Sequence, residues 1–364
     1  MASENSSIIF KNPVIRGFNP DPTICVVPAE SSTPTAFFLS TSTFEFFPGC
    51  AIYTSNNLID WKLIGHALTR RSQIDMRTVE PGAGTYLSSS FYVWTDNIWD
   101  DNAWSDPVYF DNPGFDQDLF WDDDGKVYLS TTMRIAWRDP DSKQKDFAIH
   151  ISEIDIATGR TLTPPKVIRE SPYGLAEGSH IFKRGDWYYL LTAEGGTELG
   201  HQEWILRSKE GPYGPWESQV RPSQDRRFGQ LILEEIILSW DGIKKVFITQ
   251  PPPRTVLIVK GTPIKQSYTL RERPGVLRLY GNCYDLTSPE TPAMFLRKQT
   301  SYNQTFKARM EFKPTVRGYE AGVVLWWSQY SYASIGVMAS QNNNGEIEPK
   351  VIYKGATGKA SEFE

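Results

Sequence analysis

The chain has few of the residues that build metal centres or disulfide frameworks. Its 364 residues include only 4 histidines and 3 cysteines. Cys25, Cys50 and Cys283 lie far apart, no CxxC pair is present, and the histidines do not cluster. We therefore interpret the cysteines as buried or free thiols, and we expect neither a disulfide framework nor a metal site.

The chain also lacks an excess of positive charge and a long apolar segment. Its formal net charge is -5, so no basic patch is available to attract nucleic acid or an anionic membrane. It contains no run of about 18 apolar residues, the length that a membrane span needs. The N-terminal residues lack the basic and apolar regions of a secretory signal. We expect an intracellular protein, with secretion left open, that binds neither nucleic acid nor a membrane.

Aromatic residues, proline and glycine are abundant. Aromatic side chains make up 13% of the chain, which also has 25 prolines and 27 glycines. Many short strands separated by turns use residues in this way. Since 364 residues exceed what one hydrophobic core usually supports, we expect an all-β protein with two domains.

Three segments repeat one pattern, in which aromatic or β-branched residues run into small hydroxyl residues. They are residues 37–42, 127–132 and 188–193. Each is followed by a second apolar segment, at residues 51–61, 148–155 and 203–208. Turn signals stand at Asp124-Gly125 and Gly185-Asp186. We predict repeated β-meanders of the kind that form propeller blades, with the three segments as strands of equivalent position.

The repeat is not complete. An aromatic second strand starts at Phe91, but its only candidate first strand, residues 85–89, lies immediately upstream, so half a blade is absent. A fifth unit is represented by residues 231–249 alone, and the prolines at 251–253 end it. From about residue 262, alternating segments predict antiparallel strands of an incomplete β-sandwich: residues 276–280, 306–312, 321–327 and 332–338.

Three short acidic segments carry the chemistry: residues 17–22, 114–120 and 176–180. Each places one carboxylate, Asp21, Asp116 or Glu177, beside glycine, proline or aromatic residues, where it can be held rigidly and partly desolvated. Pro20 and Pro22 restrict the backbone on both sides of Asp21. With so few histidines and cysteines, the pattern favours carboxylate chemistry, which is the chemistry of glycosidic bond cleavage.

These segments and their neighbours resemble glycoside hydrolase family 43, most closely its β-xylosidase and α-L-arabinofuranosidase members. The resemblance is carried, in the family's order, by residues 12–22, 42–49, 114–125, 176–183, 193–197 and 273–279. It implies a five-bladed β-propeller over residues 8–255 and a concanavalin-like β-sandwich over residues 262–364. The family's Trp-Ala-Pro element and its Gly-His-Ala/Gly-Asp-Leu strand have no counterpart here. We therefore expect a propeller that lacks internal segments and a truncated sandwich.

The resemblance also implies a mechanism that inverts the anomeric carbon. Asp21 would be the general base that activates water, Glu177 the general acid that protonates the leaving oxygen, and Asp116 would orient Glu177 and tune its pKa. Phe44 would form part of the sugar-binding wall, and Thr197 would be a polar neighbour of the substrate.

The expected substrates are xylo- or arabino-oligosaccharides with a terminal β-D-xylosyl or α-L-arabinofuranosyl residue. No cofactor is expected. The family can carry a structural calcium ion, but the histidine that helps to place it has no counterpart in this sequence. The sequence predicts no particular oligomeric state.

Other polar residues near the motifs have structural interpretations. Asp118 lies two residues after Asp116, hence on the same side of a strand. His180 is interpreted as a hydrogen-bonding core residue, and Glu194 as a residue that either lines the site or caps a loop.

A different function also stays open, namely a catalytically impaired carbohydrate-binding protein or a non-functional fragment that keeps the acids but not the pocket. An enzyme acting on fructosides ranks lower, because its usual Trp-Met-Asn-Asp-Pro start is absent.

Overall fold

The computed structural model describes residues 12–29, 34–77, 90–135, 146–172, 174–196, 200–220, 257–299, 301 and 303–354. Within these ranges the chain forms strands and loops and no helix, so the all-β prediction is confirmed for the described residues. Accordingly, none of them forms an apolar helix of membrane-spanning length. By their contacts the residues divide into two compact units, which are treated separately below: residues 1–24, 37–85 and 249–364 form one, and residues 25–36 and 86–248 form the other.

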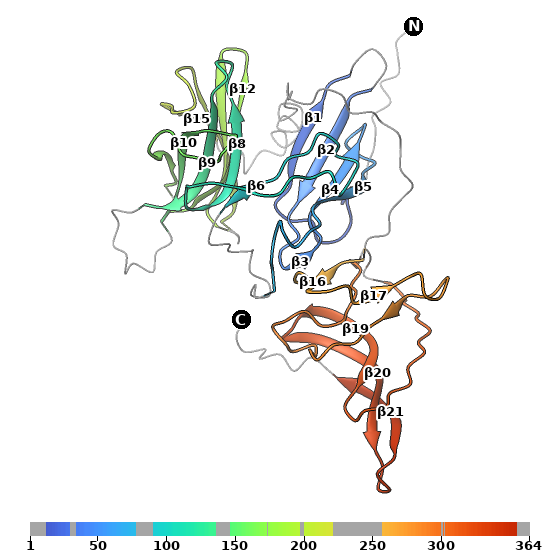
Figure 1. Ribbon diagram of the computed structural model, residues 1–364. Helices are drawn as coiled ribbons and strands as arrows, with labels where there is room; N and C mark the ends of the chain where they lie inside the picture. The colour runs from blue at the N-terminus through green and yellow to red at the C-terminus, as the bar shows by residue number, and fades with distance from the viewer. Residues whose placement is uncertain are drawn as a thin grey trace. The chain divides into compact units, whose positions relative to one another are not determined.

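Three four-stranded sheets follow one another along the chain (Figure 1). The first has the order β1 (Thr23–Val27), β2 (Ala36–Thr41), β4 (Gly49–Ser55), β5 (Lys62–Leu68). The second has the order β8 (Phe115–Trp121), β9 (Val127–Arg134), β10 (Phe147–Ile154), β11 (Lys166–Glu170). The third has the order β12 (Ala176–Arg184), β13 (Trp187–Glu194), β14 (Gln202–Ser208), β15 (Glu217–Val220). The three segments of the repeated pattern are β2, β9 and β13, the second strand of each sheet, so their equivalence is confirmed.

Glycines make the turns that join first and second strands where the sequence predicted them. Gly125, between β8 and β9, has a φ of 84°, and its amide donates to Asp122 O at 3.0 Å. Gly185, between β12 and β13, has a φ of 57°. Positive φ costs glycine nothing, which lets each first strand fold back directly onto the second.

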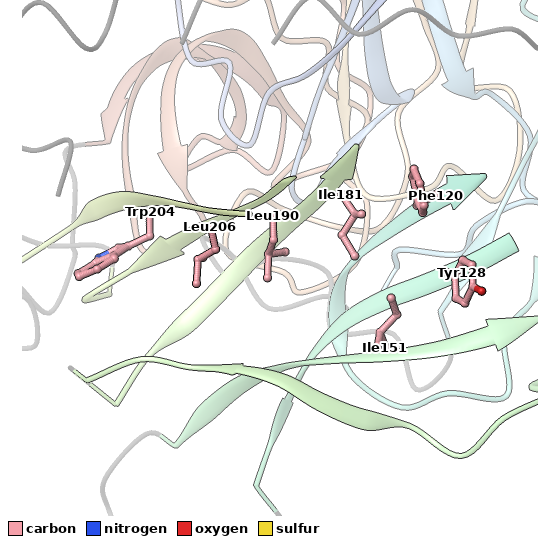
Figure 2. Close-up of a cluster of buried hydrophobic side chains, with 7 residues drawn as sticks. All are labelled: Phe120, Tyr128, Ile151, Ile181, Leu190, Trp204 and Leu206. Atoms are coloured by element: carbon pink, nitrogen blue, oxygen red, sulfur yellow. The ribbon is translucent and has the colours of Figure 1, made fainter. Parts of the chain in front are cut away.

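The second and third sheets share a hydrophobic core (Figure 2). β8, β9 and β10 contribute Phe120, Tyr128 and Ile151, and the third sheet contributes Ile181, Leu190, Trp204 and Leu206. Leu190 and Ile151 are fully buried. Apolar burial of this kind fixes one sheet on the next and sets β8 beside β12.

A short two-stranded sheet begins at Phe91, where the sequence predicted a blade with one half missing. β6 (Phe91–Tyr92) pairs with β7 (Val108–Tyr109). Tyr92 and Phe110 pack against Val127, Leu129 and Ile154 of the second sheet. The segments at 85–89 and 231–249, which bear on the number of blades, lie outside the described residues.

The remaining strands occupy the C-terminal part of the chain and one early segment. β3 (Phe46–Phe47) pairs with β16 (Val259–Lys260), β17 (Tyr268–Thr269) pairs with β18 (Arg278–Leu279), and β19 (Glu320–Ser328), β20 (Ser331–Gln341) and β21 (Ile347–Lys354) form a sheet in that order. Strands were predicted at 321–327 and 332–338, and these are β19 and β20. Residues 306–312 alternate in sequence but form no strand here, and β21 was not predicted.

One face of the sheet β19-β20-β21 is apolar. The register sets Val323 opposite Ile335 and Ile335 opposite Tyr353, so the odd-numbered residues of the paired segments share this face. Leu325 and Trp327 on the same face are 74% and 83% exposed. An apolar face of this kind is typical of a sheet that belongs to a β-sandwich.

Candidate active site

Asp21, Asp116 and Glu177 occupy equivalent positions in the three four-stranded sheets. Asp21 stands two residues before β1, Asp116 is the second residue of β8, and Glu177 is the second residue of β12. Each of these strands comes first in its sheet along the chain and lies at an edge of that sheet. The three carboxylates therefore begin three copies of one structural unit.

Two of the acids and Phe44 lie on a backbone conformation that non-glycine residues seldom adopt. The φ angle is 51° at Asp21, 51° at Asp116 and 48° at Phe44. A non-glycine residue in this left-handed region costs roughly 1–3 kcal/mol and persists only where its surroundings hold it. Such strain concentrates at active sites and ligand clamps. Three of the predicted site residues thus lie at strained positions, as do Cys50 and Leu58, whose φ angles are 54° and 64°.

Ser42 connects Asp21 with Phe44. Its backbone amide donates to Pro20 O at 3.0 Å, and its hydroxyl oxygen accepts a hydrogen bond from the Phe44 amide at 3.3 Å. Burial of the carboxyl raises the pKa of Asp21 above its ordinary value, and a hydrogen bond with the Ser42 side chain partly offsets this rise. Ser42 was not singled out in the sequence, although it begins the motif at 42–49.

Two side chains from distant segments hold the loop before β1. Tyr53 Oη donates to Asn19 Oδ1 at 2.8 Å. Lys298 Nζ donates to the same oxygen at 3.0 Å and to Phe18 O at 2.8 Å. Burial lowers the pKa of Lys298. These bonds fix residues 18 and 19 and so support the strained backbone at Asp21.

A second aromatic ring lies against Phe44. The centroids of Phe18 and Phe44 are 5.1 Å apart, and the rings meet edge to face at 76°. Phe18 is 57% exposed. Exposed ring faces near a carboxylate provide the apolar surface on which sugar C–H groups pack. Phe18 stands in the same acidic segment as Asp21 but was not predicted as a site residue.

Asp116 binds the backbone next to Glu177. The amide of Gly178 donates to Asp116 Oδ2 at 3.1 Å. Glu177 pairs with Ala193, whereas His180 pairs with Leu191, so β12 carries one extra residue at this point. Such a β-bulge bends a strand and redirects its side chains. Gly178 has a φ of 58°, which favours glycine at this position.

Gly114 allows β8 to start close to β9. A Cβ atom at Gly114 would lie 2.4 Å from Thr132 O and 2.3 Å from the hydroxyl oxygen of Thr131, and the φ of Gly114 is 117°. β8 has its own bulge between Phe115 and Asp118. The local sequence thus directs both Asp116 and Asp118 toward β12, in agreement with the prediction that they share one side of the strand.

Glu194 is a structural residue rather than part of the site. Its side chain is fully buried, and its carboxylate accepts from Arg169 Nε at 2.7 Å, Arg169 Nη2 at 3.1 Å and the Thr192 hydroxyl at 2.8 Å. Thr197, the predicted polar neighbour of the substrate, lies outside the described residues.

The structure brings the predicted residues together in two groups. Asp21 and Phe44 belong to one compact unit, and Asp116 and Glu177 to the other. Within the described ranges, no three His, Cys, Asp or Glu side chains are arranged to hold a metal ion. The chemistry available to both groups is that of carboxylates beside hydrogen-bond donors and aromatic rings.

A cavity of about 590 Å³ lies in the second unit, beside the start of β8. Its walls include Gly114, Phe115, Met133, Phe147 and His150. Burial lowers the pKa of His150, whose Nδ1 lies 3.1 Å from Ala148 O. The cavity adjoins the residues that position Asp116, but it is mainly apolar and the acids do not line it.

Comparison with known proteins identifies the family. Residues 10–227 match the model of glycosyl hydrolases family 43. The chain belongs to this family. Residues 252–362 match the model of the beta xylosidase C-terminal concanavalin A-like domain.

Similar proteins include enzymes with two different specificities. This family 43 chain is 28% identical to a xylan 1,3-beta-xylosidase of a Vibrio species, over 94% of this chain and 81% of the relative. It is 29% identical to a non-reducing end alpha-L-arabinofuranosidase of Bacteroides ovatus, over 87% of this chain and 73% of the relative. The solved xylan beta-1,4-xylosidase from Bacillus halodurans C-125 has the same fold, with a TM-score of 0.69 and 24% identity over 96% of this chain and 83% of that one.

The alignment with the Vibrio enzyme also bears on the length of this family 43 chain. It extends over 446 positions, whereas the chain has 364 residues. The alignment must therefore include positions at which the relative has a residue and this chain has none. This supports the expectation that internal segments are missing.

Proposed function

We propose that this chain is an exo-acting glycosidase that removes terminal β-D-xylosyl or α-L-arabinofuranosyl residues from xylan-derived oligosaccharides. One observation carries the proposal: the three carboxylates of the family motifs begin the first strands of three successive sheets, two of them on strained backbone. Catalytic acids held by a rigid scaffold are arranged in this way. The names of the similar enzymes supply the substrate class.

In the proposed mechanism, Asp21 removes a proton from the attacking water and Glu177 protonates the leaving oxygen. Asp116 fixes the backbone that carries Glu177, through its hydrogen bond to Gly178. Phe44, with Phe18 beside it, packs against the sugar. Inversion requires room for a water molecule, with the two carboxyl groups about 6.5–9.5 Å apart. No cofactor takes part.

The three four-stranded sheets are, in this proposal, blades of an incomplete five-bladed β-propeller over residues 8–255. A concanavalin-like β-sandwich over residues 262–364 follows it. Sheets of four strands in meander order, with functional residues on the first strand, support this arrangement.

The direct test is hydrolysis of nitrophenyl β-D-xyloside and nitrophenyl α-L-arabinofuranoside by the purified chain. We expect wild type to release nitrophenol and Glu177→Gln to release it more slowly, with a larger loss on xylobiose, whose leaving oxygen needs a proton. Glu210→Gln, the same change at an exposed loop position, should behave as wild type. The first sugar anomer formed, observed by proton NMR, should be of opposite configuration to the substrate. If the wild-type protein is folded but no more active than Glu177→Gln, the proposed glycosidase activity is refuted.

A second candidate is a carbohydrate-binding protein without turnover. The positions missing from the alignment with the Vibrio enzyme favour it, because absent propeller segments could remove part of the pocket. This candidate predicts that xylo-oligosaccharides bind equally to wild type and Glu177→Gln in calorimetry, while neither protein releases product.

Removal of the Ser42 hydroxyl should change the pH dependence of the proposed enzyme. Its hydrogen bond lowers the pKa of Asp21, so Ser42→Ala should raise that pKa. A general base must be ionised, and the acidic limb of kcat/KM should therefore move to higher pH. Activity above the limb should change little.

Ser42→Thr is the matched control for this prediction, because it retains a hydroxyl group. Its pH profile should follow wild type. An acidic limb that stays in place in Ser42→Ala, measured with nitrophenyl xyloside, would show that Ser42 does not tune the catalytic base.

A further inference from the structure

The bulge of β12 is held from outside its own sheet. Between the pairs Glu177–Ala193 and His180–Leu191, two residues of β12 face only Thr192 of β13. A bulge takes backbone amides out of the regular ladder, and buried amides need other acceptors. β12 is an edge strand of the third sheet and β8 is an edge strand of the second. Carboxylates of β8 supply the acceptors.

Two aspartates of β8 bind different amides of β12. Asp116 Oδ2 accepts from the Gly178 amide at 3.1 Å, and Asp118 Oδ2 accepts from the Ile181 amide at 3.1 Å. One bond is to Gly178, which lies within the bulge, and the other is to Ile181, one residue after the pair His180–Leu191 that ends it. The family resemblance implies that Asp116 orients Glu177. It implies no role for Asp118.

Asp118 also binds a side chain of β12. Its Oδ1 lies 3.3 Å from His180 Nδ1, and the side chains of Asp118 and His180 are 22% and 41% exposed. The Asp118 carboxylate thus binds β12 at two points, the His180 ring and the Ile181 amide. Since hydrogen bonds between charged groups are stronger than neutral ones, protonation of His180 strengthens its interaction with Asp118.

The groups around His180 favour its protonated form. Asp116 and Asp118 face it from β8, and Glu203 faces it from β14. Burial alone would lower the pKa of His180, but the hydrogen bond to Asp118 and the charges of Asp118, Glu203 and Asp116 outweigh it and raise the pKa above its ordinary value. Burial raises the pKa of Glu203, and the charge of His180 opposes that rise.

We propose that Asp118 and His180 form a charge-coupled positioning pair that fixes the bulge of β12 and thereby the direction of the Glu177 side chain. Its effect on turnover rests on the proposed function, whereas its effect on β12 does not. Neither residue takes part in a bond-making step. The pair acts through the backbone between residues 177 and 181.

Three variants of the full-length chain test the pair. Asp118→Asn keeps an oxygen that can accept from the Ile181 amide but removes the charge. Asp118→Ala removes both interactions. Asp124→Asn is the matched control, since Asp124 is an exposed residue in the turn that follows β8, with a 53% exposed side chain.

The first measurement is an NMR titration of the four histidine rings in protein with labelled histidine, with the His180 signal assigned by its loss in His180→Gln. In wild type and Asp124→Asn the pKa of His180 should lie above the ordinary value of about 6.5. In both Asp118 variants it should fall relative to wild type, because the hydrogen bond and the charge of Asp118 are the largest contributions that raise it. If the pKa of His180 is the same in Asp118→Asn as in wild type, the proposed coupling between Asp118 and His180 is wrong.

The second measurement is hydrogen exchange of residues 176–182 by mass spectrometry. Asp118→Ala should exchange about 10-fold faster than wild type in this peptide, and Asp118→Asn should lie between the two, because it keeps an acceptor for the Ile181 amide but loses the charge that pairs with His180. Equal exchange in wild type and Asp118→Ala would show that Asp118 does not hold the bulge. Both readouts are independent of catalysis, so they judge the pair even if the wild type proves inactive.

The third measurement is steady-state hydrolysis of nitrophenyl xyloside. Asp118→Asn should lower kcat at least 10-fold with KM within about threefold of wild type, and its pH profile should lose the dependence that follows His180. Asp124→Asn should match wild type. If the wild type is active and Asp118→Asn retains its kcat and pH profile, the positioning role fails while the proposed function stands.

Discussion

Glu177→Gln should lose about 10³-fold in kcat/KM on xylobiose but far less on a xyloside with a dinitrophenolate leaving group. A general acid contributes roughly 10²–10⁴-fold where the leaving oxygen needs a proton. The alkoxide of a sugar is a poor leaving group and needs one, whereas dinitrophenolate leaves without assistance. The ratio of the two rate losses therefore measures acid catalysis at position 177 and is insensitive to a general loss of folded protein.

Asp21→Asn should give the opposite signature. The attacking water needs its base whatever the leaving group, so both substrates should lose a similar factor of 10³-fold or more. The comparison is made at fixed pH with proteins of equal thermal stability. If Glu177→Gln lost the same factor on both substrates and Asp21→Asn spared one of them, the assignment of acid and base would have to be reversed or abandoned.

The repeated unit could be predicted from the sequence because its signal is local. The aromatic and hydroxyl pattern of residues 37–42, 127–132 and 188–193 describes largely buried strands, and the turns at Gly125 and Gly185 mark where they fold back. These features fix which strand is second in each sheet. The three acids then appear at the start of each first strand, as their segments suggested.

The backbone around the acids could not be predicted from the same patterns. The positive φ at Asp116 and the bulges at 115–118 and 177–180 depend on contacts between two sheets. The support of the Asp21 loop by Lys298 joins residues about 280 positions apart in the sequence. Periodicity within a segment carries no information about such contacts, so Phe18, Ser42 and Asp118 were not selected as site residues.

The C-terminal strands show the limit of periodicity more clearly. Residues 306–312 alternate as a strand would, yet Phe306 is 68% exposed and the segment has no strand in the structure. Alternation predicts a strand only where a partner strand is available. β21, which pairs with β20 along its whole length, contains a proline and two lysines that hide its pattern.

A buried lysine joins three parts of the first unit and should contribute strongly to its stability. Lys260 in β16 is 3% exposed. Its Nζ donates to the carbonyl oxygens of Ser288, Pro289 and Glu290 at 2.7, 2.9 and 3.2 Å, and to Gln329 Oε1 at 2.9 Å. Burial lowers the pKa of Lys260. The buried ammonium group is thus satisfied by four oxygens, and it ties the loop at 288–290 and the buried Gln329 to β16.

Lys260→Met should therefore destabilise the protein by about 3 kcal/mol, since four oxygens, including that of the buried Gln329, lose their donor at once. For a cooperative unit of this size class, that loss corresponds to a fall in Tm of roughly 6–12 °C in differential scanning calorimetry. Lys350→Met, at a side chain that is 55% exposed, should change stability by less than about 0.5 kcal/mol. Equal unfolding curves for the two variants would mean that the loop at 288–290 and Gln329 are not held by Lys260, and that the three parts of the unit are joined by apolar packing alone.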